Sequence, residues 1–328
     1  MHYRSLGNSG IDASIVGLGT WATGIEPDEK ASTRVIHAAL DAGITLIDTA
    51  PSYGWGRSEE IVGRAIRGRQ DQAVIATKCG IWWSDARGSF NGQKDGKDTY
   101  ICLRAETLRL EVEASLQRLN VEAIDLLQVH KPAIEPQLTP VEETMGCLMD
   151  LKREGKVRAI GVSNVSMEQL KSYQEHGNLD AQQFRYNMLN REPESSFLPH
   201  CSKHGIAALT YTSLEQGLLT GKVSLDREFE PTDFRSQVGQ WMPWFKPENL
   251  TQLLSLFDGW HELLEHYNCS ISQLVIAWTA MAPRASHVLC GSRSPAQAQE
   301  NAAGGAIVIS DKDATRITTD LNKLGAPT

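Results

Sequence analysis

The segment ITLIDTAPSYGWGRSEEIVGRAIRG, residues 44–68, contains one complete strand–loop–helix unit. Its first five residues, ITLID, are mostly aliphatic or β-branched, which predicts a short buried strand. A loop rich in Gly and Pro follows, and then a helical pattern begins at Ser58, a residue type that favours the N-cap position. The strand therefore ends at Asp48, and Tyr53 lies in the loop between strand and helix.

This strand–loop–helix unit recurs along the chain. The predicted strands cover residues 14–18, 44–48, 73–78, 124–130, 157–164, 181–187, 206–212 and 287–292. The predicted helices cover residues 28–43, 58–68, 103–119, 141–154, 166–175, 194–204, 247–267, 270–281 and 294–303. No Pro- or Ser-rich linker divides the chain, so we expect a single domain over residues 1–328. Alternating units in a chain of this length predict an α/β fold, the parallel (β/α)8 TIM barrel.

The segment YRSLGNSGIDASIVG, residues 3–17, predicts a β-hairpin around the turn NSG that plugs the bottom of the barrel. The alternative fold is a doubly wound sheet, which a glycine-rich dinucleotide fingerprint would support. GLGTWATG, residues 17–24, contains G-x-G, but its third glycine is misplaced and no helix is expected directly after it. The sequence therefore favours the barrel.

Composition argues against several classes of partner. The formal net charge is −8 and the pI is about 5.6, so we expect no nucleic-acid partner. No apolar run approaches the length of a membrane span, and MHYRSLGNSG lacks the apolar core of a signal peptide. The six cysteines are scattered without a C-x-x-C pair, which indicates reduced thiols in a cytoplasmic protein rather than disulfides or a zinc site.

Polar residues follow three neighbouring strands at their carboxyl ends, where barrel enzymes place their chemistry. Asp48 ends the second strand and Tyr53 lies in its loop, while Lys78 ends the third strand. His130 ends the fourth. A lysine ammonium beside a phenol stabilises the phenolate and lowers the phenol pKa, and a buried carboxylate keeps the lysine charged. A histidine nearby can bond to a carbonyl oxygen or relay a proton. Such a site can protonate an oxygen that gains negative charge, as reduction of a carbonyl by hydride requires.

Eight blocks of the sequence resemble, in the same order, the signature blocks of the aldo-keto reductase superfamily. They are GLGTW, IDTAPSYGWGRSEEIVGRAI, ATKCG, IDLLQVHKP, GKVRAIGVSN, QQFRYNML, LTYTSLEQGLLTGK and GSRSPAQAQENAA, and they extend to about residue 303. The segment GLLTGK resembles the branch that contains bacterial reductases and potassium-channel β subunits. The resemblance implies that Asp48, Tyr53, Lys78 and His130 form a catalytic tetrad. In it, Tyr53 would be the general acid in reduction and the general base in oxidation, and the other residues would tune it or orient the carbonyl.

The resemblance also implies a nicotinamide dinucleotide that binds across the mouth of the barrel. The residues expected to contact this cofactor are Gly19, Thr20, Trp21, Asp48, Ser163, Asn164, Gln183, Tyr211, Thr212, Leu214, Gln216, Gly217, Leu218, Lys222, Gly291, Ser292, Arg293, Gln297, Glu300 and Asn301. Ser163, Asn164 and Gln183 would bond to the carboxamide, and Tyr211 would stack on the nicotinamide. No metal is expected, because His130 has no histidine partner at helical or strand spacing and H-E-x-x-H is absent.

Three positions depart from the family pattern around the cofactor. YTSL, residues 211–214, replaces the common Tyr-Ser-Pro-Leu but keeps the stacking tyrosine. Gly291 stands where many members have lysine, and Gln297 stands where many have a basic residue near the 2′-phosphate of NADP. Arg293 remains as a guanidinium that can grip this phosphate. We therefore expect NADP(H) in preference to NAD(H).

The loops after the strands are rich in tryptophan. The residues are Trp21, Trp55, Trp82, Trp83, Trp241 and Trp244. We expect Trp21, Trp55 and Trp82 to contact the substrate together with Tyr53 and His130, whereas the two tryptophans after strand seven either line the pocket or pack the loops. Aromatic walls with a few polar groups, and a polar loop over residues 84–98, suit a ligand with apolar and hydroxyl faces. A sugar, a cyclitol or a sugar-derived ketone or aldehyde is therefore expected rather than a steroid or lipid.

The leading hypothesis is an NADP(H)-dependent oxidoreductase that interconverts a small carbonyl compound and an alcohol. The rival is a cofactor-sensing regulatory subunit with slow turnover, similar to the channel β subunits. The predicted hairpin begins within the first few residues, so no N-terminal inactivating extension is expected, and this favours the free enzyme. No heptad pattern or exposed apolar stripe distinguishes a monomer from a homo-oligomer.

Overall fold

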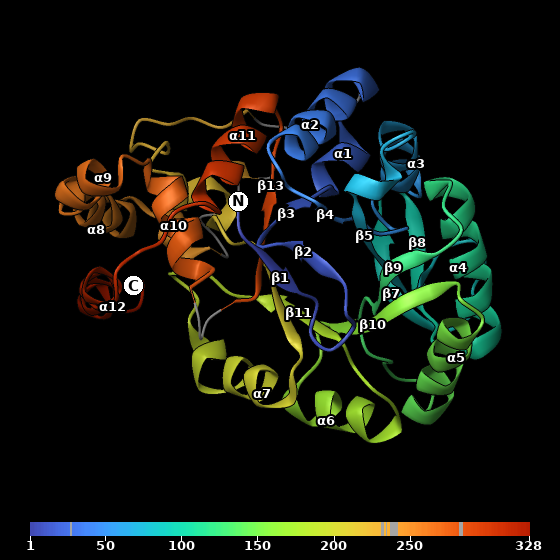
Figure 1. Cartoon of the computed structure of the whole chain (residues 1–328). Coiled ribbons are helices and arrows are strands. Elements are labelled where there is room, and N and C mark those ends of the chain that lie inside the picture. Colours follow the sequence, from blue (N-terminus) through green and yellow to red (C-terminus); the bar gives the residue numbers. More distant parts are fainter. Residues whose placement is uncertain (27, 231–232, 234, 237–241, 282–284) are drawn as a thin grey trace.

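The computed structural model describes residues 1–26, 28–230, 233, 235–236, 242–281 and 285–328. Eight parallel strands close into a barrel (Figure 1). Around the barrel they are β3 (Val16–Gly19), β4 (Leu46–Asp48), β5 (Val74–Cys79), β9 (Ile124–Val129), β10 (Val157–Ser163), β11 (Ala181–Arg185), β12 (Ala207–Tyr211) and β13 (His287–Gly291). Each lies within or beside a predicted strand, and the predicted (β/α)8 TIM barrel is confirmed.

Helices surround the barrel on its outside (Figure 1). Those in the predicted positions are α2 (Glu29–Asp41), α3 (Arg57–Ala65), α4 (Ala105–Leu119), α5 (Val141–Arg153), α6 (Met167–His176), α7 (Phe197–His204), α8 (Pro247–Asp258), α9 (His261–Tyr267), α10 (Ile271–Thr279) and α11 (Pro295–Gly304). Two further helices differ from the sequence prediction. The short α1 (Trp21–Ile25) begins one residue after GLG, with Thr20 at its N-cap position. The other, α12 (Asp311–Leu324), has a signal that was missed: Ser310 caps it, and Ala314, Ile317 and Leu321 are buried at helical spacing.

The helices bury their apolar faces against the outside of the strands. In α2, Val35, Ile36, Ala39 and Leu40 recur at helical spacing, and all four side chains are buried. They belong to one large apolar cluster that includes outward-facing strand residues such as Ile47. This layer fixes the strands, and therefore fixes the positions at which their carboxyl ends present side chains.

A second apolar cluster fills the inside of the barrel and its lower end. Small or aliphatic strand residues, among them Leu46, Ala76 and Leu126, point inward and pack together. The hairpin of β1 (Tyr3–Ser5) and β2 (Asp12–Ser14) adds Leu6 and Ile11 to this cluster. The hairpin lies across the centre of the barrel in Figure 1, so the predicted plug is present.

The polar segment 84–98 is not the open loop that the sequence suggests. It contributes β7 (Ser89–Lys94) and the first two residues of β8 (Lys97–Ile101), and these strands form an antiparallel sheet with β6 (Ile81–Trp82). The turn between β7 and β8 is Asp95-Gly96, and both residues have positive φ. An Asp-Gly pair at positive φ is the usual two-residue hairpin turn, so the signal was present in the sequence.

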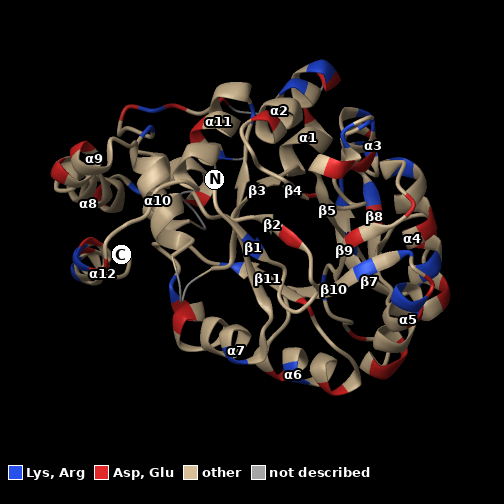
Figure 2. Cartoon of the chain, in the orientation of Figure 1, with Lys and Arg blue, Asp and Glu red and all other residues tan. Residues whose placement is uncertain are grey.

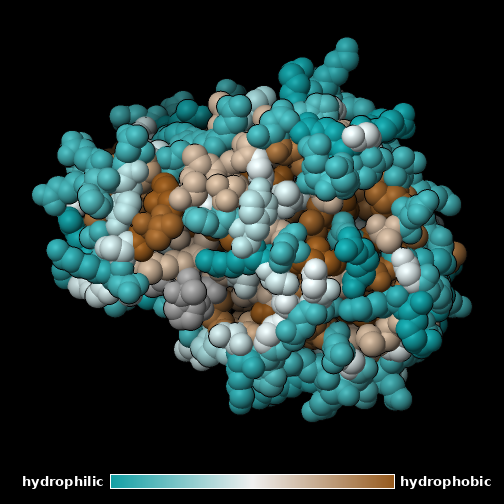
Figure 3. Space-filling model, viewed as in Figure 1, coloured by the Kyte–Doolittle hydropathy of each residue, from teal (hydrophilic) through white to brown (hydrophobic). Residues whose placement is uncertain are grey.

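Charged residues of both signs are interspersed on the outer helices (Figure 2). In the space-filling view, hydrophilic residues cover most of this face, and apolar residues show mainly in the recesses between them (Figure 3). Among the described residues, no helix is both long enough and apolar enough to cross a membrane.

Candidate active site

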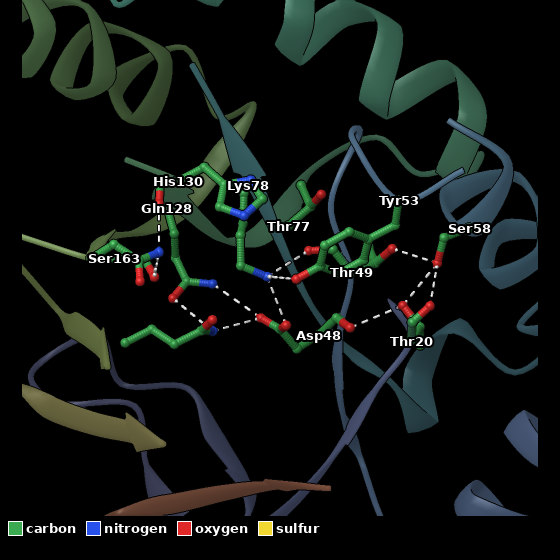
Figure 4. Close-up of polar contacts among 12 residues, drawn as sticks. Thr20, Asp48, Thr49, Tyr53, Ser58, Thr77, Lys78, Gln128, His130 and Ser163 are labelled. Carbon is green, nitrogen blue, oxygen red and sulfur yellow. Dashed lines mark hydrogen bonds and ion pairs between the residues drawn. The ribbon is translucent and has the colours of Figure 1, made fainter. Parts of the chain in front are cut away.

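A buried ion pair joins the carboxyl ends of β4 and β5. Lys78 Nζ donates to Asp48 Oδ2 at 2.7 Å and to the Thr49 carbonyl oxygen at 2.9 Å (Figure 4). The two side chains are only 1% and 5% exposed. Burial lowers the pKa of Lys78, but Asp48 and Tyr53 raise it more, so the pKa lies above its ordinary value. Lys78 is therefore a fixed, fully charged ammonium.

The other carboxylate oxygen of Asp48 is held by two amides. Gln128 Nε2 donates to Asp48 Oδ1 at 3.2 Å, and Gln183 Nε2 donates to it at 2.8 Å. Gln128 was missed in the sequence. It precedes His130 by two positions, so the alternation of a strand would have placed it at the same face of β9. The carboxylate is thus fully bonded, which prevents it from turning away from Lys78.

Tyr53 is held over the ammonium by a tight loop after β4. Its hydroxyl accepts a hydrogen bond from Lys78 Nζ at 3.4 Å (Figure 4). Gly24 and Gly54 allow α1 to approach this loop: Gly54 has a φ of +62°, and a Cβ there would lie 2.2 Å from the Gly24 carbonyl oxygen. Burial raises the pKa of the Tyr53 phenol, and Lys78 offsets this only in part. The lowering of the phenol pKa expected from the sequence is therefore outweighed by burial.

Ser58 supports this loop from inside α3 rather than capping the helix. The N-cap position belongs to Gly56. The Ser58 hydroxyl instead donates to the Thr20 carbonyl oxygen at 3.0 Å and lies 2.9 Å from Thr20 Oγ1. Because Thr20 N in turn donates to the Asp48 carbonyl oxygen at 2.9 Å, Ser58 connects the loop to the end of β4.

His130 lies beside Tyr53 at the end of β9. Its ring centroid is 6.0 Å from that of Tyr53, and the two rings meet edge to face. Its backbone N–H donates to the Cys79 carbonyl oxygen at 2.9 Å, which ties it to β5. Burial holds the pKa of His130 well below its ordinary value, and the charges of Lys78, Lys131 and Lys94 lower it further. The imidazole is therefore neutral at physiological pH.

These residues open into a cavity of about 810 Å³. This volume is within the range of about 300–1,000 Å³ that is usual for ligand pockets. Tyr53 and His130 line it, and so do most of the residues expected to contact the cofactor. Those are Gly19, Thr20, Trp21, Asp48, Asn164, Gln183, Tyr211, Thr212, Leu214, Gln216, Gly217, Lys222, Gly291, Ser292, Arg293, Gln297, Glu300 and Asn301. The structure thus brings together residues from both halves of the chain.

Several expected site residues do not line this cavity. Ser163 and Leu218 are buried beside it, and Ser163 Oγ accepts a hydrogen bond from the side chain of Asn164 at 3.0 Å. Trp55 packs edge to face on Trp83, with a ring separation of 5.5 Å. Trp82 donates from Nε1 to Asp85 Oδ1 at 2.9 Å and lies under the Arg87 guanidinium. Trp244 is buried in the core, and Trp241 lies outside the described residues.

The two ends of the cavity are lined by different kinds of side chain. At one end, the Tyr211 ring and the side-chain amides of Asn164 and Gln183 lie near Tyr53, and Tyr211 OH donates to Asn164 Oδ1 at 2.8 Å. At the other end, the cavity is lined by cations. They are Lys222, Arg227, Arg235 and Arg293. An aromatic ring with amides at one end and cations at the other fits a nicotinamide dinucleotide.

Ion pairs hold three of these cations in place, and the guanidinium of Arg227 lies over the Phe229 ring. Lys222 Nζ lies 2.6 Å from Glu300 Oε2, and Arg293 lies 3.8 Å from Asp233, which also pairs with Arg235 at 2.6 Å. The sequence analysis missed Arg227 and Arg235, because they lie in a segment without helical or strand periodicity.

Among the described residues, no group of three or more His, Cys, Asp and Glu side chains could hold a metal ion.

Comparisons with known proteins agree with this geometry. Residues 15–320 match the model of the aldo/keto reductase family. The chain is 39% identical over 317 residues to an NADH-specific methylglyoxal reductase of Escherichia coli (strain K12). These aligned residues cover 94% of this chain and 95% of that protein. It is 30% identical over 312 residues to a probable voltage-gated potassium channel subunit beta of Arabidopsis thaliana, covering 92% and 90%. A glycerol dehydrogenase structure from Gluconobacter oxydans has a TM-score of 0.87 and 36% identity, over 99% of this chain and 96% of that chain.

Proposed function

Because the chain belongs to the aldo/keto reductase family, we propose that it is an oxidoreductase that uses NADP(H) to interconvert a small carbonyl compound and an alcohol. One observation carries the proposal: the buried pair of Lys78 and Asp48 lies within hydrogen-bonding distance of the Tyr53 hydroxyl, beside a cavity large enough for cofactor and substrate. This arrangement suits proton transfer to a carbonyl oxygen and has no evident structural purpose, since buried ion pairs contribute little net stability.

Tyr53 acts as the proton donor in reduction. When bound, a reduced nicotinamide supplies a hydride to the carbonyl carbon. Tyr53 donates its proton to the carbonyl oxygen, and its raised pKa keeps it protonated at neutral pH. Lys78 stabilises the phenolate that remains, and Asp48 keeps Lys78 charged and in place. In the oxidation direction the phenolate accepts the proton of the alcohol.

His130 orients the carbonyl for this transfer. A neutral imidazole can donate one ring N–H to the carbonyl oxygen without competing with Tyr53 as an acid. The edge-to-face contact with Tyr53 fixes the imidazole beside the phenol ring. Two donors that converge on one oxygen stabilise the negative charge that develops there during hydride transfer.

The cations of the cavity support NADP(H) as the preferred cofactor. Asn164, Gln183 and Tyr211 would hold the nicotinamide end, and Arg293 would grip the 2′-phosphate. The name of the E. coli relative points to NADH instead. Measurement of kcat/KM with NADPH and NADH distinguishes the two, and a clear preference for NADH would overturn this part of the proposal.

The substrate that we propose is small and hydroxylated, such as a sugar- or cyclitol-derived aldehyde or ketone. Trp21 supplies an aromatic wall, and it lines the cavity together with Tyr53 and His130. The names of two relatives, a methylglyoxal reductase and a glycerol dehydrogenase, refer to small polar compounds. Values of kcat/KM for keto-sugars, inososes, methylglyoxal, aromatic aldehydes and steroids test this choice. A steroid or long-chain aldehyde preferred at least tenfold would contradict it.

The cysteines support a reducing compartment for this enzyme. All six are free, and all but Cys269 are buried. We propose that the protein works in the cytoplasm, where free thiols are stable.

The rival function is a regulatory subunit that senses the cofactor, and the similarity to a channel subunit beta favours it. Oxidation of NADPH, followed at 340 nm against a panel of aldehydes and ketones, separates the two functions. The proposed enzyme turns over at least one carbonyl at an ordinary catalytic rate of about 1 per second or more. Nucleotide binding without turnover of any carbonyl would support the sensor instead.

A further inference from the structure

Two buried carboxyl groups from the surrounding helices bond to β5, one before Lys78 in the sequence and one after it. Because side chains alternate along a strand, Lys78 points into the barrel while Thr77 and Cys79 point toward the helices. Thr77 Oγ1 donates to Glu59 Oε1 of α3 at 2.6 Å. The second carboxyl group, Glu111 of α4, accepts a hydrogen bond from the Gly80 backbone N–H at 2.7 Å.

The Gly80 contact fixes a peptide unit that touches the active site. The same peptide carries the Cys79 carbonyl oxygen, which accepts the hydrogen bond from the His130 backbone at 2.9 Å. Glu111 therefore holds the N–H side of this peptide, and His130 holds the carbonyl side. Gly80 has a φ of +95°, so the chain turns away from the barrel directly after this unit. Without the Glu111 contact, the Gly80 N–H would lose its hydrogen-bond acceptor, and this side of the peptide would no longer be held.

Glu111 is an unusual residue to find in a core. It is 4% exposed, and its second oxygen, Oε1, has no hydrogen-bond partner among the described residues. Burial raises its pKa to about 8, the nearby Glu59 adds to this, and the Gly80 hydrogen bond and Arg118 oppose it. A buried carboxyl group with one unsatisfied oxygen costs stability. An apolar residue would serve packing better, which indicates that the contact to Gly80 has another purpose.

We propose that Glu111 is a positioning residue for proton transfer: through the peptide of Cys79 and Gly80, it holds Lys78 and His130 in place relative to Tyr53. This inference rests on the proposed carbonyl reduction at the same site. Glu111 is not among the residues that line the cavity, so it acts only through the backbone of β5. Misplacement of a catalytic group by about 1 Å can reduce the rate about 100-fold, which sets the scale of the effect.

The chain offers a matched control at the opposite end of the same strand. Asp125 Oδ2 accepts a hydrogen bond from the Ile75 backbone N–H at 2.8 Å, and Asp125 is 9% exposed. Loss of this contact removes a similar bond from β5 but leaves the end at Lys78 untouched. Comparison of variants at Glu111 and Asp125 therefore distinguishes a specific loss of active-site geometry from a general loss of support for the strand.

The test compares Glu111→Ala, Glu111→Gln and Asp125→Ala with the wild-type enzyme. We expect kcat to fall about 10- to 100-fold in E111A, with the KM for NADPH within about twofold, because the cofactor cavity is unchanged. E111Q keeps an acceptor for the Gly80 N–H and should retain kcat within about threefold. D125A should lower the melting temperature but leave kcat of the folded enzyme unchanged. An unchanged kcat in E111A, or an equal loss in D125A, would overturn the proposal.

A second measurement does not depend on turnover. The NMR signals of the His130 imidazole, assigned with His130→Gln, report the position of the ring. They should shift in E111A and stay unchanged in D125A and E111Q. If the wild-type protein reduces no carbonyl, the proposed function fails, and this spectrum alone decides the role of Glu111: unshifted His130 signals in E111A would refute it.

Discussion

The buried pair of Lys78 and Asp48 predicts an unequal response to removal of each partner. Asp48→Asn leaves an ammonium that is 1% exposed with only neutral acceptors, the Thr49 carbonyl oxygen and the Tyr53 hydroxyl. Breaking a buried pair in this way costs about 3–5 kcal/mol of unfolding free energy. Lys78→Met leaves the Asp48 carboxylate with its two amide donors, Gln128 and Gln183. Because each such bond to a charge contributes about 1.5–3 kcal/mol, we expect K78M to cost clearly less than D48N.

The double variant D48N/K78M completes the cycle. It contains no buried charge at this position, so its loss of stability should be smaller than the sum of the two single losses by at least about 2 kcal/mol. The assay is urea unfolding of the four proteins at pH 7, followed by tryptophan fluorescence and circular dichroism. All three variants should lose carbonyl reduction. Additive losses within about 0.5 kcal/mol, or a K78M variant less stable than D48N, would refute the account of this pair.

Three other predictions concern the cofactor, the core and the tyrosine loop. Arg293→Ala should lower kcat/KM for NADPH about tenfold or more and leave that for NADH nearly unchanged, as steady-state kinetics with both cofactors will check. The pKa of Glu111 is about 8 in the folded protein against an ordinary 4.5, so the folded state binds the proton more tightly and is destabilised as pH rises between these values. Relative to Glu111→Gln, the unfolding free energy of the wild type should therefore fall by up to about 1.4 kcal/mol per pH unit from pH 5 to 8; a flat difference would contradict the raised pKa. Gly54→Ala places a Cβ against the Gly24 carbonyl oxygen at positive φ and should cost about 1–3 kcal/mol in thermal or urea unfolding and also lower kcat.

Much of the fold and of the candidate site could be predicted from the sequence. The eight strands were readable because buried parallel strands are short apolar runs between helices with a clear period. The positions of Asp48, Lys78 and His130 followed from this, since each ends a strand and parallel strands present their carboxyl ends at one mouth.

Other features depend on tertiary contacts that no local pattern shows. Ser58 looks like an N-cap, but its hydroxyl finds a better partner in Thr20 from a distant part of the chain. Whether the pKa of the Tyr53 phenol rises or falls depends on how deeply the phenol is buried, because burial raises this pKa and Lys78 lowers it. The sequence does not give the depth of burial. Arg235 reaches the cavity from an irregular segment and bonds to the Gln216 carbonyl oxygen at 3.4 Å, a contact without periodicity.

The central claim is that Tyr53 donates the proton in carbonyl reduction, and Tyr53→Phe tests it most directly. This substitution removes the hydroxyl that Lys78 bonds and keeps the ring that packs against His130. We predict that kcat for the best carbonyl substrate falls by about 10²–10⁴-fold, while NADPH binding, measured by quenching of tryptophan fluorescence, stays within about twofold. A variant that reduces the same substrate at the wild-type rate would contradict the role of Tyr53 and, with it, the proposed mechanism.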